Sequence, residues 1–134
     1  MRSEAVAIRE AREEVGLHLE HAEPLGALPP IPVRPEGPLG LLSPFVFYVG
    51  MERPPLVPQQ AEVADAFWIP LAHLWDEGNR GTIDWEHLGQ KMRFPGIRFR
   101  EHVIWGLTHR VLASWGEQLG RPLPGAGDKP FVRL

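Results

Sequence analysis

The chain has 134 residues, 43% of them hydrophobic and 23% charged, which is typical of a single soluble globular domain. The formal net charge of -3 means that the chain lacks the excess of basic residues typical of nucleic-acid-binding proteins. No stretch approaches the roughly 18 uninterrupted apolar residues of a membrane span. There is no cysteine, which excludes disulfides, thiol catalysis and zinc–thiolate sites and is compatible with a reducing cytoplasm. From these features together we expect a cytoplasmic protein with no nucleic-acid or membrane partner.

A helix is predicted at the start of the chain, over residues 3–17. Ser3 is a suitable N-cap, the interior is rich in Ala, Glu and Arg, and Gly16 stands near the end as a stop. The following segment 26–33 is apolar but contains three prolines, so it can form at most a short or edge strand.

Two strands are predicted in the middle of the chain. Aromatic and β-branched residues fill 44–51, which indicates a buried strand, and the alternation in 62–69 indicates a second. Pro70 then opens a short helix over 71–77.

The last third of the chain predicts short extended pieces followed by a helix. Residues 82–88 and 91–99 suit two such pieces around turns, and an apolar stripe at every fourth position predicts a helix over 102–119. The order of helix, strands and helix indicates an α+β fold in which a sheet is packed between helices. We expect one domain over 1–120 and a loosely ordered tail over 121–134.

Three carboxylates lie on one face of the first helix. At about 100° per residue, Glu10, Glu13 and Glu14 oppose the apolar face of the helix. Their like charges destabilise the helix by a few tenths of a kcal/mol per pair, and a bound magnesium or manganese ion reverses that sign. A merely solvated acidic face with an ordinary Arg9–Glu13 pair remains an open alternative.

The same segment resembles the second half of the catalytic box of the Nudix hydrolases, G-x5-E-x7-R-E-U-x-E-E-x-G-U, where U is aliphatic or small. The matching positions are Arg9, Glu10, Ala11, Glu13, Glu14, Gly16 and Leu17. The resemblance implies a Nudix-like mixed sheet packed between helices and an Mg²⁺ or Mn²⁺ site at Glu10, Glu13 and Glu14. It also implies a catalytic role for Glu13 and ion pairing of Arg9 with the loop that precedes the helix.

The resemblance is incomplete at its beginning. The first glutamate of the box falls where Met1 stands, and the glycine loop and leading strands have no counterpart in the sequence. We therefore expect a Nudix-like fold that lacks its leading strands. We also expect a homodimer in which a second copy covers the exposed sheet edges.

Two downstream segments resemble the same family. Residues 62–71 contain an E-V-x6-P-L pattern, and 104–108 read I-W-G-L-T, which is similar to a signature of the coenzyme A pyrophosphatase branch. The resemblance implies that Glu62 is a further metal ligand or the base that activates water. The alternative is a surface carboxylate at a strand edge.

Other polar and aromatic residues carry weaker signals. Lys91, Arg93, Arg98 and Arg100 suit the solvated face of a half-buried strand, with phosphate binding as the alternative. Trp68 and Trp85 are candidates for stacking on a base. The six histidines show no metal-ligand spacing.

Two functional hypotheses follow. The first is a metal-dependent hydrolase of the pyrophosphate bond in coenzyme A or a related nucleoside diphosphate derivative. The alternative is a catalytically impaired Nudix-derived module that binds a ligand or a partner.

Overall fold

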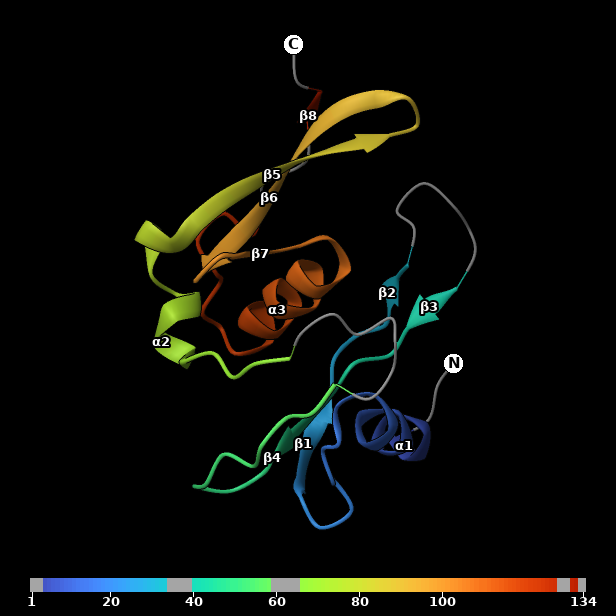
Figure 1. Ribbon diagram of the computed structural model, residues 1–134. Coiled ribbons are helices and arrows are strands. Elements are labelled where there is room, and N and C mark those ends of the chain that lie inside the picture. The colour runs from blue at the N-terminus through green and yellow to red at the C-terminus, as the bar shows by residue number, and fades with distance from the viewer. Residues whose placement is uncertain (1–3, 34–39, 59–65, 128–130, 133–134) are drawn as a thin grey trace. The chain divides into compact units, whose positions relative to one another are not determined.

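The computed structural model describes residues 4–33, 40–58, 66–127 and 131–132 (Figure 1). The chain divides into two compact units, residues 1–68 and 69–134. Helices and antiparallel strand pairs occur in the described residues, so the predicted α+β class is confirmed. The domain boundary that we placed at residue 120 stays a prediction.

The first unit combines one helix with two small antiparallel sheets. Its elements are α1 (Glu4–Val15), β1 (Glu23–Ala27), β2 (Ile31–Pro32), β3 (Leu41–Leu42) and β4 (Phe45–Tyr48). β1 pairs with β4, and β2 pairs with β3. The strand predicted over 44–51 is present as β4 but is shorter than predicted, and it is not buried: Phe45, Val46 and Phe47 are half-buried and Tyr48 is exposed. The proline-broken segment 26–33 contributes only short strands, because proline cannot donate to a ladder.

Helix α1 ends where the sequence predicts. Gly16 has φ 70°, a left-handed conformation that glycine adopts without the penalty of a Cβ atom. Its N–H donates to the carbonyl of Arg12 at 3.0 Å, which satisfies one of the free carbonyls of the last turn. The predicted N-cap, Ser3, lies outside the described residues.

The strand predicted over 62–69 is wrong where it can be compared with the structure. Residues 66–69 form no strand, and 62–65 lie outside the described part of the chain. All four of residues 66–69 are half-buried, whereas a strand with one solvated face alternates. The side chain of Trp68 is held instead by a hydrogen bond from its indole N–H to the carbonyl of Pro54, at 2.9 Å.

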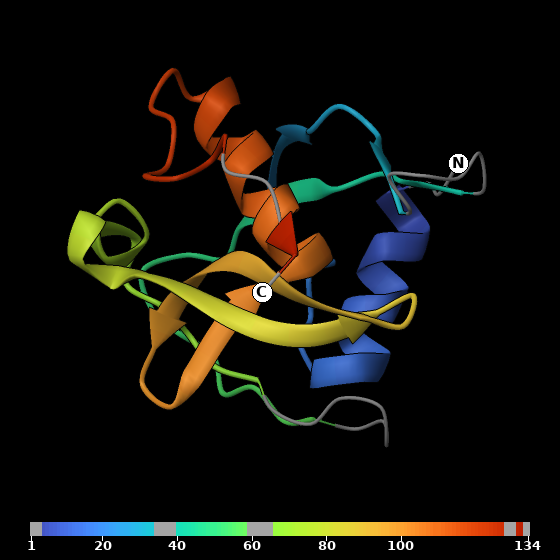
Figure 2. The same cartoon turned by 90° about the horizontal axis from the view of Figure 1, so that it is seen from above.

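The second unit is a twisted sheet with a helix on one face. Its elements are α2 (Leu71–Leu74), η1 (Glu77–Asn79), β5 (Arg80–His87), β6 (Gln90–Phe99), β7 (His102–Trp105), α3 (Gly106–Gln118) and β8 (Phe131–Val132). The strand order is β5-β6-β7, and β8 also pairs with β6. α3 lies along one face of this sheet (Figure 2). The core is formed by Leu74, Ile97 and Leu123, against which Ile69, Trp75, Ile104, Leu112, Trp115 and Ala126 pack.

The two extended pieces predicted over 82–99 form one long hairpin. His87 pairs with Gln90, so Leu88 and Gly89 make a two-residue turn with φ of 53° and 78°. Positive φ at both central positions is the pattern of a type I′ turn, whose twist matches that of the strands. Gly96 in β6 is fixed by sterics, because a Cβ there would lie 2.6 Å from the carbonyl oxygen of Ile104.

The helix predicted over 102–119 begins four residues later than expected. His102–Trp105 is strand β7, which pairs with the end of β6, and α3 starts at Gly106. Gly106 has φ 67°, so the backbone changes direction there and the helical hydrogen bonds begin only afterwards. The I-W-G-L-T sequence therefore crosses a strand–helix junction rather than lying inside the head of a helix.

Candidate functional site

The acidic face of α1 is accessible. Glu13 is exposed, and Glu10 and Glu14 are half-exposed. The Nε atom of Arg9 lies 3.8 Å from Oε1 of Glu13, and the two side chains are 65% and 53% exposed. An ion pair this exposed contributes on the order of 1 kcal/mol or less. This ion pair thus joins Arg9 to a residue one turn along its own helix.

The donor atoms on this face fit a hard divalent cation in kind, since Mg²⁺ and Mn²⁺ prefer carboxylate oxygens. They do not form a preassembled coordination site: within the described residues, no three His, Asp or Glu side chains lie close enough together to hold a metal ion. Repulsion between like charges on an exposed helix face accounts for side chains that stay apart. The metal site at Glu10, Glu13 and Glu14 stays a prediction.

The end of α1 is tied to a loop that comes more than forty residues later in the chain. The N–H of Val57 donates to the carbonyl of Val15 at 2.8 Å. In the same loop, the carbonyl of Pro54 accepts the hydrogen bond from the indole of Trp68. Glu62 lies outside the described residues.

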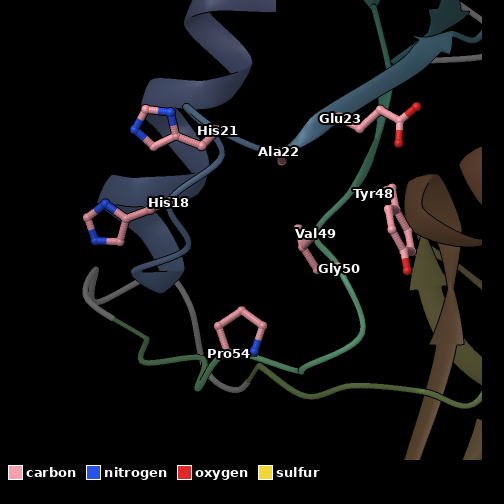
Figure 3. Close-up of a pocket in the computed structure, with 8 residues that line it drawn as sticks. All are labelled: His18, His21, Ala22, Glu23, Tyr48, Val49, Gly50 and Pro54. Atoms are coloured by element: carbon pink, nitrogen blue, oxygen red, sulfur yellow. The ribbon is translucent and has the colours of Figure 1, made fainter.

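An open pocket of about 340 Å³ lies in the first unit, starting at the turn that follows α1 (Figure 3). It is lined by His18, His21, Ala22, Glu23, Tyr48, Val49, Gly50 and Pro54. The two imidazoles come from the turn, and Tyr48 comes from the end of β4 on the other side (Figure 3). The hydroxyl of Tyr48 donates to the sulfur of Met51 at 3.4 Å.

Sequence reasoning missed this pocket because its lining joins two segments about thirty residues apart. The spacing of His18 and His21 gave no metal-ligand signal, and Nδ1 of His18 lies 3.8 Å from Oε2 of Glu20 in the same segment. The only available hint was the position of both histidines directly after the acidic helix.

Two basic residues of β6, Arg93 and Arg98, make polar contacts within the second unit. Nε of Arg93 lies 2.8 Å from Oδ1 of Asp84 on the neighbouring strand, and this hydrogen bond and the carboxylate charge raise the pKa of Arg93. Nη2 of Arg98 donates to the carbonyl of Gly78 at 3.1 Å. These contacts favour the structural role for Arg93 and Arg98 over phosphate binding.

Among the helices of the described residues, none is long and apolar enough to cross a membrane.

Comparison with known proteins points to one family. No family model matches the chain. A protein from Photorhabdus laumondii named as an uncharacterized Nudix hydrolase, NudL, is 32% identical over 117 residues, which cover 86% of this chain and 59% of that protein. A protein of the same name from Salmonella newport is 30% identical over 120 residues, covering 87% of this chain and 58% of that protein.

The chain thus spans less than two thirds of the length of these curated relatives. The similarity runs through most of the chain, beyond the acidic segment alone. The chain is therefore similar to these two Nudix hydrolases over most of its own length, and it also has an R-E-x-x-E-E sequence on the helix that precedes Gly16.

Proposed function

We propose that the chain hydrolyses the pyrophosphate bond of coenzyme A or a related nucleoside diphosphate derivative, with Mg²⁺ or Mn²⁺ bound at α1. The observation that carries the proposal is the accessible face with Glu10, Glu13 and Glu14 on a helix of matching sequence. The names of the relatives support hydrolysis. The choice of coenzyme A rests on the I-W-G-L-T resemblance alone.

In this proposal the carboxylates of Glu10, Glu13 and Glu14 hold the cation. When bound, the cation lowers the pKa of a water molecule and neutralises charge on the phosphoryl oxygens. Glu13 or Glu62 accepts the proton of the attacking water while a new P–O bond forms and the bridging P–O bond breaks. Arg9, 3.8 Å from Glu13, orients that carboxylate.

The alternative is a Nudix-derived module that binds a ligand or a partner without turnover. A homodimer remains part of the proposal in either case. Every residue of β1 is exposed, so this edge of the β1–β4 sheet is available to a second copy.

An assay of the purified chain on coenzyme A tests the proposal. With magnesium, each turnover is expected to convert one diphosphate into two phosphomonoesters, and an excess of EDTA is expected to stop the reaction. Chromatography of the nucleotide products measures both. The absence of any magnesium-dependent cleavage of coenzyme A or of other nucleoside diphosphate derivatives would leave the binding module as the better description.

A further inference from the structure

The segment that follows β4 contains a methionine that is almost fully exposed. Met51 is 93% exposed, whereas Met92 on β6 is half-buried and pairs with Trp85 of β5 and Val132 of β8. Met1 lies outside the described residues. The chain has no cysteine, so its sulfur atoms are the thioethers of these three methionines. Of the two methionines that the structure describes, Met51 therefore has the more accessible sulfur.

The sulfur of Met51 accepts a hydrogen bond from a nearby side chain. The hydroxyl of Tyr48 donates to Sδ of Met51 at 3.4 Å. Gly50 stands between the two residues with φ 101°, a conformation that other residues rarely adopt, so the chain changes direction there. A thioether sulfur is a weak acceptor, so this hydrogen bond becomes stronger if a better acceptor replaces the sulfur.

Oxidation of the thioether supplies a better acceptor. The sulfur lone pair attacks a hydroperoxide and forms an S–O bond, the O–O bond breaks, and the proton of the transferred oxygen passes to the oxygen that leaves as water or an alcohol. The thioether is oxidised by two electrons and the peroxide is reduced by two. The product, a sulfoxide, is polar. Its oxygen accepts an O–H bond at about 2.7 Å between the oxygen atoms, which is shorter than a bond to sulfur.

Tyr48 connects Met51 to the pocket of the first unit. Tyr48 lines that pocket together with Val49 and Gly50 (Figure 3). Its side chain is 45% exposed, so surrounding atoms do not enclose the ring and the hydroxyl can follow its acceptor. A change in the hydrogen bond between Tyr48 and Met51 is therefore a change in one wall of the pocket.

We propose that Met51 is an oxidation site for hydroperoxides and that Tyr48 transmits the oxidation state of Met51 to the pocket. The inference goes beyond the proposed hydrolysis and does not depend on it, since no residue of α1 and no metal ion takes part. Methionine sulfoxide is returned to methionine by sulfoxide reductases, so the modification is reversible.

The experiment treats the chain with dilute hydrogen peroxide in EDTA and follows each methionine by peptide mapping and mass spectrometry. Met51 is expected to gain one oxygen atom completely before Met92 is detectably oxidised, because susceptibility follows exposure. Tyr48 is the single tyrosine of the chain, so the NMR signal of its ¹³C-labelled Cζ atom is assigned without ambiguity. This signal is expected to shift on oxidation and to return after treatment with sulfoxide reductases.

Met51→Leu is the matched control, because it keeps an apolar side chain without sulfur at a position where exposure leaves the fold unaffected. Its Tyr48 signal is expected to stay unchanged under the same peroxide treatment. Three outcomes would overturn the proposal: oxidation of Met92 as fast as that of Met51, an unchanged Tyr48 signal in the fully oxidised wild type, or an equal shift in Met51→Leu. Coenzyme A hydrolysis can fail or succeed independently of all three.

Discussion

Replacing Glu13 with glutamine is expected to lower magnesium-dependent hydrolysis of coenzyme A by roughly 10²–10⁴-fold, the range found when an acid–base group is removed. Glutamine keeps the size and the helix propensity of the side chain, but it can neither bind a hard cation well nor accept a proton. Glu13 is exposed, and so is its ion pair with Arg9, so the fold should be unaffected. Steady-state kinetics at saturating magnesium measure the effect.

Glu4→Gln is the matched control for this substitution. Glu4 is an exposed glutamate in the first turn of the same helix, and it is not part of the resemblance to the Nudix box. Its activity is expected to stay within about twofold of the wild type, since an exposed surface substitution changes stability by only about 0.5 kcal/mol. Equal turnover of Glu13→Gln and Glu4→Gln would remove Glu13 from the mechanism.

A second large effect is expected in stability, with opposite signs in the presence and absence of metal. In EDTA, the triple variant Glu10→Gln, Glu13→Gln, Glu14→Gln should be more stable than the wild type by a few tenths of a kcal/mol, because repulsion between the carboxylates is removed. In Mn²⁺ at a hundred times its Kd, the wild type should gain about 2.7 kcal/mol and the variant nothing. Thermal unfolding in the two buffers measures both differences.

The diagnostic result is a change of order: the wild type is less stable than the triple variant in EDTA and more stable than it in Mn²⁺. A general effect of salt or of divalent ions would shift both proteins in the same direction, and NaCl added at equal ionic strength controls for the effect of salt. If Mn²⁺ stabilises the triple variant as much as the wild type, the cation binds elsewhere on the chain.

The sequence predicted elements well where one local signal determined them. Composition and Gly16 set the length of α1, and the glycine's positive φ is the physical reason for its end. The predicted start of α3 was too early because Val103, Leu107 and Val111 follow the helical four-residue spacing across the boundary between β7 and α3. The stripe continues through β7 into the helix, and only the backbone at Gly106 separates them.

Long-range contacts explain the remaining differences. The alternation in 62–69 predicts a strand only if a second strand pairs with it, and the segment 66–69 has none in the described structure. The pocket at His18 and Tyr48 and the bond between Val57 and Val15 join segments that are far apart in sequence, so spacing along the chain contains no signal for either. The acidic face was predictable because its three carboxylates share a single helix.

The binding of Mn²⁺ to α1 is the central claim, and paramagnetic NMR tests it most directly. Substoichiometric Mn²⁺ added to the ¹⁵N-labelled chain is expected to broaden the amide signals of Glu10, Glu13 and Glu14 first, and the triple glutamine variant should lose this effect. Selective broadening around other residues, with the α1 signals unchanged, would contradict the assignment of the metal site and the hydrolytic function that is built on it.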